Sequence, residues 1–277
     1  LPEVETVRRL LANGLVGQKP SKVEIADDNI VFGSAPKQAY LEAFSSGAIV
    51  SVGRKGKYFW FETESGPTVF AHLGMAGWVR QIGADSIRLK EHGNAPFEDE
   101  AGVPRFWKWI LTNSGGDRFV MTDGRRFSRV WLGDSPESDP RVAALGPDCF
   151  LDPQPLDYWL AHFKKRSIAI KTALMQQQFV SGIGNWIADE ILFHSDMAPA
   201  RPCKGLSSEE VDRLLKNLDS ILSTAVEVGA DSERFPSEWM FHHRWGGAGG
   251  ADRIGPYAIL REDIGGRTTA WCPEKQK

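Results

Sequence analysis

The chain has 277 residues, of which 42% are hydrophobic and 25% charged, with 28 glycines and 16 prolines. This composition is typical of a folded globular protein and excludes an intrinsically disordered chain. No apolar run approaches the roughly 18 residues that a membrane-spanning helix needs, and the start shows no secretory signal pattern. We therefore expect no membrane partner, and at about 150 residues per domain the length favours two domains.

The cysteines and the net charge indicate the cellular compartment and the kind of partner that the protein can bind. Cys149, Cys203 and Cys272 are widely separated, which argues against a disulfide scaffold and fits a reducing compartment. We expect an intracellular protein, nuclear in a eukaryote and cytoplasmic or nucleoid-associated in a bacterium. The net charge of −3 does not by itself predict a polyanion partner. Any nucleic-acid site must come from local clusters of basic residues.

The first half of the chain is predicted to be mostly strands. Val4, Val7 and Leu11 share one face of a predicted helix over 3–16. Short β-branched and aromatic runs then predict strands within 22–32, 48–63, 68–80, 106–112 and 118–132. The turn-forming residues 113–117 predict a hairpin between the last two runs. Many short strands favour a β-sandwich.

The second half is predicted to be mostly helical. Helical patterns cover 155–165, 167–179 and 185–195, and a capping box of Ser207 and Glu210 opens a longer helix that Gly229 ends. Near the C-terminus, 246–250 predicts a flexible loop, and strand-like residues around 257–260 and 268–271 flank Gly265 and Gly266 as a hairpin. The expected class is α+β and multidomain. Its parts are 1–133 as sandwich, 134–154 as linker, 155–240 as helical domain and 241–277 as terminal hairpin.

Two features can bind phosphate. The glycine-rich segment 181–185 precedes a predicted helix, whose N-terminus can bind an anion, but the same spacing also fits a tight turn without a ligand. Basic clusters alone are usually solvated faces, whereas clusters interleaved with Phe59, Trp60 and Phe127 indicate a nucleic-acid groove. These clusters are Arg54, Lys55 and Lys57; Arg125, Arg126 and Arg129; and Lys164, Lys165, Arg166 and Lys171.

Two single residues allow alternative interpretations. Met75, between Gly74 and Gly77, fits either a core position or an apolar wedge in a base stack, and alone the core is favoured. Lys57 is either a buried amine with a lowered pKa or a side chain that reaches solvent. His242, His243 and Cys272 lack the close pairs of a structural zinc site, so we expect no metal and no cofactor.

Together these residues resemble the formamidopyrimidine-DNA glycosylase family, in the Fpg/Nei superfamily of base-excision repair, over nearly the whole chain. The motifs are at 1–9, 72–75, 123–127, 145–148, 181–190 and 265–269. The Leu-Pro-Glu-Val-Glu start favours the Fpg branch. The resemblance implies an N-terminal β-sandwich, a helical domain with a helix–two-turn–helix motif, and a zincless β-hairpin finger as in plant and fungal members.

The resemblance also implies an activity. Such members are bifunctional DNA glycosylases and AP lyases that remove hydantoins and ring-opened purines better than 8-oxoguanine, with β- and δ-elimination. The family nucleophile is an N-terminal proline followed by a glutamate. In the register of the motif, Pro2 and Glu3 belong to the stretch after that pair, so we expect the pair before Leu1. The expected partner is double-stranded DNA with an oxidised base or an abasic site, and the expected state is a monomer.

Roles carried over from the family cover two groups of residues. Met75, Arg125 and Phe127 would fill the gap behind a flipped base. Lys57 would donate a proton, Arg267 would assist the second elimination, and Glu3 and Glu190 would orient the catalytic end. The DNA-binding set is Lys57, His72, Met75, Arg125, Arg126, Phe127, Lys171, Gly182, Gly184, Asn185 and Arg267. The alternative function is a non-catalytic protein that binds lesions or abasic sites.

Overall fold

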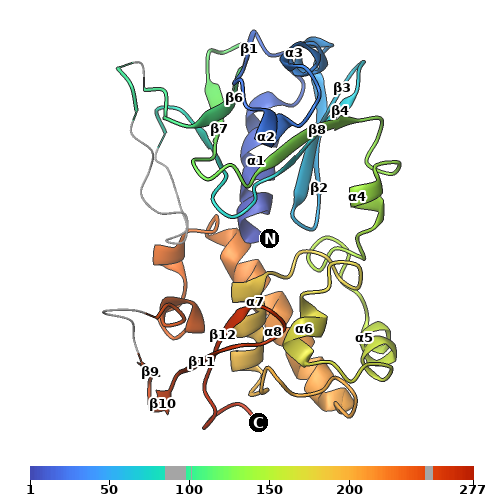
Figure 1. Cartoon of the computed structure of the whole chain (residues 1–277), viewed down its shortest axis with the longest axis vertical. Coiled ribbons are helices and arrows are strands. Elements are labelled where there is room, and N and C mark those ends of the chain that lie inside the picture. The colour runs from blue at the N-terminus through green and yellow to red at the C-terminus, as the bar shows by residue number, and fades with distance from the viewer. Residues whose placement is uncertain (85–97, 101, 247–251) are drawn as a thin grey trace. The chain divides into compact units, whose positions relative to one another are not determined.

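The structure is a computed structural model that describes residues 1–84, 98–100, 102–246 and 252–277 (Figure 1). Its contacts divide the chain into two compact units. The sandwich unit holds 2–144 and 229–232, and the helical unit holds Leu1, 145–228 and 233–277. The division after residue 144 falls inside the predicted linker. None of the described helices is long and apolar enough to cross a bilayer.

The sandwich unit contains two antiparallel sheets of four described strands each. One sheet has the order β1-β6-β7-β5 and the other β2-β3-β4-β8. The first is built from β1 (Lys22–Ile25), β6 (Trp107–Thr112), β7 (Arg118–Thr122) and β5 (Trp78–Gln81). The second is built from β2 (Ile49–Lys55), β3 (Tyr58–Thr63), β4 (Thr68–His72) and β8 (Arg129–Gly133). The predicted hairpin at 113–117 is confirmed, because β6 pairs with β7.

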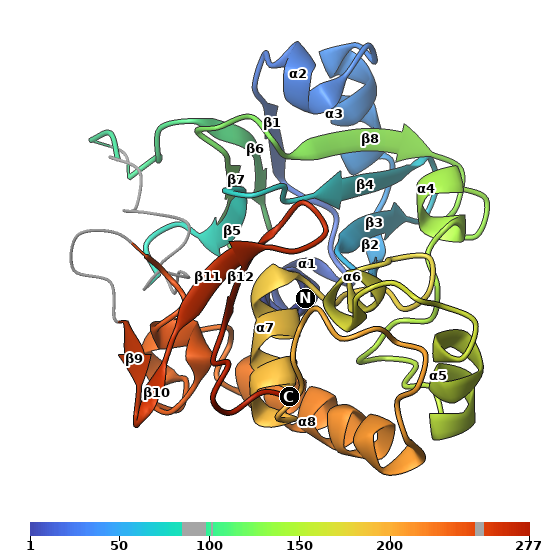
Figure 2. The same cartoon turned by 60° about the horizontal axis from the view of Figure 1, so that its bottom comes forward.

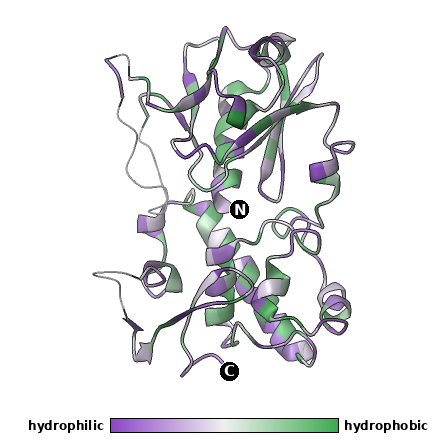
Figure 3. Cartoon of the chain, in the orientation of Figure 1, coloured by the Kyte–Doolittle hydropathy of each residue, from purple (hydrophilic) through white to green (hydrophobic). Residues whose placement is uncertain are grey.

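One hydrophobic core holds this unit together. Helix α1 (Pro2–Leu15) contributes Val7 and Leu11, while Phe59 comes from one sheet and Trp109 from the other. Burying such large apolar side chains between two sheets is the main stabilisation of a sandwich. Figure 3 shows the hydrophobic stretches of this unit along α1 and the strands. The predicted sandwich is therefore confirmed.

One predicted strand of this unit needs correction, and the unit contains helices that were not predicted. The predicted strand region 22–32 is wrong in its second half, because β1 ends at Ile25 and Asp28 caps helix α2 (Asn29–Phe32). Asp28 accepts hydrogen bonds from Ile30 N and Val31 N, which favours a helix start over a continuing strand. Helix α3 (Lys37–Ser45) was not predicted. Helix α4 (Pro140–Ala143) lies inside the predicted linker.

The helical unit follows the predicted pattern with shorter elements. It contains α5 (Leu156–Phe163), α6 (Ile170–Leu174), α7 (Asn185–His194), α8 (Ser208–Glu227) and the 3-10 turn η3 (Met240–His242). The 3-10 turn η2 (Ser232–Arg234) begins at the last residue assigned to the sandwich unit. The capping box is confirmed: Glu210 N donates to Ser207 Oγ, and Ser207 N donates to the Glu210 carboxylate. Gly229, with φ +67°, follows the end of α8.

The C-terminal segment forms two small hairpins. β9 (Arg253–Ile254) pairs with β10 (Tyr257–Ala258), and β11 (Leu260–Asp263) pairs with β12 (Thr268–Trp271). The predicted terminal hairpin is correct, but its first strand begins at Leu260 because Tyr257 pairs with Ile254 instead. In Figure 2 this red hairpin lies beside α7.

Packing surrounds the base of the terminal hairpin. The buried cluster contains Phe193, Met240, Ile254, Ala270 and Cys272. Among the described residues no group of three or more His, Cys, Asp or Glu side chains could hold a metal ion. Most of the predicted loop 246–250 lies outside the described residues.

Candidate nucleic-acid interface

Two loops of the sandwich unit pack against each other, one at 73–77 and the other at 123–128. Gly74 has φ +66°, and a Cβ there would lie 2.5 Å from the carbonyl carbon and oxygen of Phe127. Only glycine combines that backbone conformation with so close an approach. The glycine that precedes Met75 in the sequence therefore seats one loop on the other.

A buried carboxylate shapes the second loop. Asp123 is 1% exposed and accepts hydrogen bonds from Arg125 N at 2.9 Å and Ser128 N at 2.7 Å. Between these anchors the Arg125 guanidinium lies over the Phe127 ring, 5.2 Å from its centre. A carboxylate that binds two backbone N–H groups fixes a loop without using its outer side chains.

The outer side chains of these loops are exposed. Met75 is 59% and Phe127 48% exposed. The favoured interpretation of Met75 as a core residue is therefore wrong, because the loop turns it outward. Large apolar side chains on anchored loops are characteristic of a binding surface. The structure thus gathers Met75, Arg125 and Phe127 into one exposed cluster.

Arg126 is held differently from its neighbours. It has φ +57°, and its Nε and Nη2 both bind the Asp28 carboxylate, Nη2 at 2.7 Å. Lys108 Nζ binds the other oxygen of Asp28 at 2.7 Å. Arg126 therefore ties the loop to the start of α2, and a predicted DNA contact could involve only its remaining nitrogen.

Lys57 lies in the turn between β2 and β3 and is partly exposed. The buried Arg54 side chain stabilises the same turn, since Arg54 donates to the Gly56 carbonyl at 3.0 Å and to Glu5 Oε2 at 3.0 Å. Arg54 is 5% exposed, so it belongs to the scaffold and not to the predicted basic surface cluster. Burial raises the pKa of Glu5. Hydrogen bonds from Arg8 and Arg54 outweigh this effect, and the net result is a pKa lowered to about 2.

His72 ends β4 and contacts the first loop. Its Nδ1 accepts a hydrogen bond from Gly74 N at 3.1 Å. Burial, followed by the charge of Lys57, lowers the pKa of His72 to about 4. The ring is therefore neutral at pH 7 and anchors the loop that carries Met75. A direct DNA contact by His72 stays a prediction.

In the helical unit, the glycine-rich turn precedes α7 as predicted. Gly182 N donates to Gln177 Oε1 at 3.0 Å, and Gln177 Nε2 donates to the Ile183 carbonyl at 2.9 Å. Gly182 has φ +108°, and a Cβ there would meet Cys149 Sγ at 3.0 Å. Gly184 is the N-cap of α7 and has no side chain to cap the helix. The first N–H groups of α7 therefore lack a capping side chain at the N-cap, as an anion site requires.

The tip of the terminal hairpin lies next to that turn. Gly265 approaches Thr172 so closely that a Cβ would lie 2.5 Å from Thr172 Oγ1. Asn185 Nδ2 donates to the Thr268 carbonyl at 3.1 Å. Arg267, at the tip, is exposed. The structure thus brings Arg267 and Asn185 to one polar surface at the start of α7.

Lys171 contradicts its prediction. It is fully buried, and its Nζ contacts Asp189 Oδ1 at 2.6 Å, Thr269 Oγ1 at 2.7 Å and the Thr268 carbonyl at 3.2 Å. With one ion pair and two hydrogen bonds, the fully buried Lys171 ties α6 and α7 to the hairpin and is not available to a phosphate in this structure. Arg244 binds the other oxygen of Asp189 at 2.9 Å.

Glu190 is also a scaffold residue. It is fully buried in α7 and accepts hydrogen bonds from Met240 N at 2.9 Å and Phe241 N at 2.7 Å, with His194 Nε2 at 2.9 Å. Burial raises its pKa. The carboxylate therefore holds the start of η3, and the role of Glu190 in orienting the catalytic end stays a prediction. Glu3 lies in the first turn of α1, where its catalytic role stays a prediction.

Sequence reasoning missed the buried acids that organise these surfaces. Glu5, Asp28 and Asp189 each bind groups from distant parts of the chain, whereas Asp123 binds the backbone of its own loop. The available signal was an acid next to a motif residue, as in Asp123 before Arg125. The distant partners of Glu5, Asp28 and Asp189 could not be predicted from sequence spacing, because tertiary folding brings them together.

Comparisons with known proteins cover both units. The family model "Formamidopyrimidine-DNA glycosylase N-terminal domain" matches residues 1–130, and "Formamidopyrimidine-DNA glycosylase H2TH domain" matches 145–237. The whole chain is 37% identical to a formamidopyrimidine-DNA glycosylase of Arabidopsis thaliana, covering 70% of that protein. It is 30% identical to one of Geobacter metallireducens, covering 98%.

Solved structures agree on the fold. Lactococcus lactis formamidopyrimidine-DNA glycosylase bound to DNA containing an AP site matches with a TM-score of 0.76 at 24% identity, over 100% of this chain and 99% of that one. MutM in complex with DNA containing carbocyclic 8-oxo-G matches with a TM-score of 0.78 at 24% identity, with the same coverage. From these matches over both units, the chain belongs to the formamidopyrimidine-DNA glycosylase family.

Proposed function

We propose that this protein is a base-excision DNA glycosylase and AP lyase that acts on oxidised or ring-opened bases in double-stranded DNA. The observation that carries the proposal is the exposed cluster of Met75, Arg125 and Phe127 on anchored loops, in a chain of this family. An enzyme that works on a base must first take it out of the stack. Apolar wedges and a cation suit the space left behind.

The helical unit supplies the complementary chemistry. The start of α7, the Asn185 amide and the exposed Arg267 offer N–H donors and positive charge to phosphates. Phosphate contacts fix register without reading sequence, which suits an enzyme that must search all DNA. Lys57, in a braced turn of the sandwich unit, is proposed as a further phosphate contact and proton donor.

The proposed chemistry is covalent. A secondary amine attacks the sugar C1′ and the damaged base departs with a proton. The iminium that forms withdraws electrons, so loss of protons from the sugar expels first the 3′ and then the 5′ phosphate. The amine is proposed to be the family's N-terminal proline. Pro2 of this sequence is bonded through its nitrogen to Leu1 and is buried, so it is no amine nucleophile here.

The test is borohydride trapping on duplex DNA with a hydantoin lesion. The sequence as printed is compared with a form in which Pro-Glu precedes Leu1 and the proline nitrogen is free. We expect a covalent band only from the extended form. A band from both forms would assign the amine to another residue, such as Lys57, and no band from either would refute covalent catalysis.

A second candidate function is binding of lesions or abasic sites without catalysis, which would use the same exposed Met75, Arg125 and Phe127. It predicts that both forms bind lesion DNA with a salt dependence set by phosphate contacts, and that neither cuts the strand. A monomer in a reducing compartment remains part of our proposal. The three free cysteines are consistent with that compartment.

A further inference from the structure

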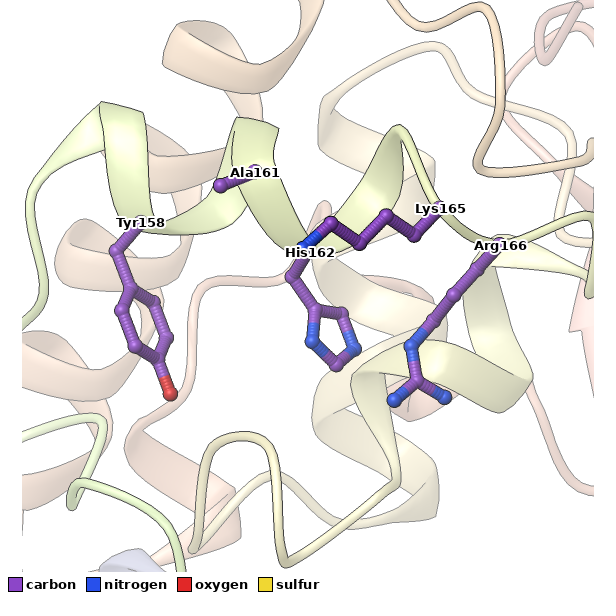
Figure 4. Close-up of a pocket in the computed structure, with 5 residues that line it drawn as sticks. All are labelled: Tyr158, Ala161, His162, Lys165 and Arg166. Atoms are coloured by element: carbon purple, nitrogen blue, oxygen red, sulfur yellow. The ribbon is translucent and has the colours of Figure 1, made fainter.

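Residues of α5 and the segment after it line two cavities that the proposed function does not use, the first of which is shown in Figure 4. The first has a volume of about 480 Å³ and is lined by Tyr158, Ala161, His162, Lys165 and Arg166. The second has a volume of about 430 Å³, shares Tyr158, His162 and Arg166, and is also lined by Gln176, Gln178 and Phe179. Cavities of this size, lined by aromatic groups and a few polar ones, commonly hold small ligands.

Helical spacing brings these side chains together. Tyr158, His162 and Lys165 follow one another at four and three positions, so they lie on one face of α5 and its C-terminal continuation. Figure 4 shows the Tyr158, His162 and Arg166 side chains reaching from this segment to the same side. The face is therefore aromatic at one end and cationic at the other.

The aromatic end is planar. The His162 ring stacks on the Phe179 ring with centres 3.4 Å apart and planes within 8°. The Tyr158 ring is also near parallel to Phe179, at 5.5 Å and 5°, and its hydroxyl donates to the Phe179 carbonyl at 2.8 Å. Flat, fixed rings of this kind are the surfaces on which nucleobases stack.

The positive charges at the cationic end are not neutralised by nearby carboxylates of the described residues. Within the described part of the chain, Lys165 and Arg166 have no carboxylate at salt-bridge distance, and Arg166 donates to the neutral Gln176 Oε1 at 2.9 Å. Burial, followed by the charge of Arg166, lowers the pKa of His162 to about 4, so the ring is neutral at pH 7. Its Nε2 is enclosed without a hydrogen-bond partner.

The electrostatic potential also differs between the two ends of this face. Burial and then the charge of Asp152 raise the pKa of Tyr158, which places a negative group near the aromatic end. An anion is therefore repelled from the Tyr158 end and attracted to Lys165 and Arg166 at the other. A ligand with a flat neutral part and a phosphate at one end matches this arrangement.

We propose that the α5 face binds a nucleotide unit, with its base against the Tyr158 and His162 rings and its phosphate on Lys165 and Arg166. The unit is either a free nucleotide or an unpaired nucleotide of a DNA strand, since both present the same base and phosphate. The site lies outside the residues proposed for glycosylase chemistry and does not depend on them.

The test is an NMR titration of the full chain, read at the ring signals of His162 and Tyr158. The probes are deoxyadenosine monophosphate, inorganic phosphate, and a duplex with and without an unpaired tail. We expect saturable shifts with the mononucleotide or the tailed duplex, and affinity lowered about fivefold by Lys165→Gln and by Arg166→Gln. Lys164→Gln removes the same charge one residue away, outside the cavity lining, and should leave the affinity unchanged.

The different probes distinguish a free nucleotide from an unpaired nucleotide of a DNA strand, and they can refute the site. Shifts with the mononucleotide indicate a free nucleotide, whereas shifts confined to the tailed duplex indicate a strand. Equal affinity for inorganic phosphate and the mononucleotide, equal effects of Lys164→Gln and Lys165→Gln, or no shift with any probe would each overturn the proposal. Borohydride trapping by the form extended with Pro-Glu tests the proposed function without reference to the α5 face, so failure of either proposal is recognised independently.

Discussion

At the residue scale, buried carboxylates set the geometry that exposed residues use. Glu5 receives hydrogen bonds from Arg8, Arg9 and Arg54, and Arg54 in turn supports the Gly56 carbonyl in the turn that carries Lys57. Removing one partner of a buried ion pair leaves an unpaired charge, which is far more costly than losing a surface pair.

Glu5→Gln should lower the free energy of unfolding by about 3–5 kcal/mol at pH 7, because it leaves Arg54 buried without its anion. The folded-state pKa of Glu5 is depressed from 4.5 to about 2. Its stabilisation is therefore complete above pH 4.5 and is lost as the pH falls through about 2. Urea unfolding between neutral and acid pH measures both effects.

The exposed Glu42→Gln is the control for this prediction. Glu42 accepts one exposed hydrogen bond, from Gln38, and should change stability by less than about 0.5 kcal/mol. A Glu5→Gln protein as stable as Glu42→Gln, or one whose stability falls as steeply with acid as the wild type, would contradict the role given to this ion pair.

Met75→Ala should leave stability within about 0.5 kcal/mol, because the side chain is exposed. It should lower kcat/KM on lesion DNA about tenfold, since the apolar wedge offsets an unstacking cost of a few kcal/mol. Leu73→Ala, two residues earlier and 6% exposed, is the matched control and should instead lose about 2–5 kcal/mol of stability. Thermal unfolding and strand cleavage distinguish the two; unchanged cleavage in Met75→Ala would refute the wedge.

At the element scale, local caps define where helices begin, and tertiary contacts define what they hold. The capping box at Ser207 follows directly from sequence. By contrast, α6 and α7 are held to the terminal hairpin through Lys171, Asp189 and Thr269, residues that lie far apart along the chain. Helix termini and loops can therefore be tested separately from the ion pairs between elements.

Ser207→Ala should lower stability by about 1 kcal/mol, because Glu210 N loses its acceptor at the start of α8. Ser223→Ala, at an exposed position within the same helix, removes the same hydroxyl without removing a cap. It should be neutral or slightly stabilising, since alanine favours helix. Chemical unfolding of both variants measures the difference, and equal effects would argue against the capping box as a stabilising element.

At the scale of the whole molecule, a net charge of −3 is compatible with a DNA partner because the cations are locally arranged. What counts is which cations can reach a phosphate. Arg267 is exposed at the hairpin tip, whereas Lys171 is fully buried and paired. The structure thus separates cations that the sequence had grouped together.

DNA affinity should fall with rising salt, and each lost phosphate contact should reduce the slope of log affinity against log salt by about 0.9. Arg267→Gln should reduce the slope by about that amount. Lys171→Met should leave the slope unchanged while lowering stability, because its charge is used by Asp189. Binding isotherms over a salt series, below the melting temperature of each variant, test both; a reduced slope in Lys171→Met would restore Lys171 as a phosphate contact.

The sequence alone determined the parts whose signals are local. The period of apolar residues fixed α1, the turn at 113–117 fixed a hairpin, and the capping box fixed the start of α8. The motif residues Met75, Arg125 and Arg267 were identified from sequence through the resemblance of their motifs to a known family, not through spacing. The second half of the predicted strand over 22–32 failed, since the Asp28 cap outweighs β propensity there.

Only the tertiary structure decided which charged residues face outward. Lys171 and Glu190 looked like site residues, yet folding surrounds each with partners from distant segments. Met75 looked like a core residue, yet the contact of Gly74 with the Phe127 backbone turns its loop outward. The physical reason is that burial and ion pairing depend on groups far apart in the chain, which no local spacing can specify.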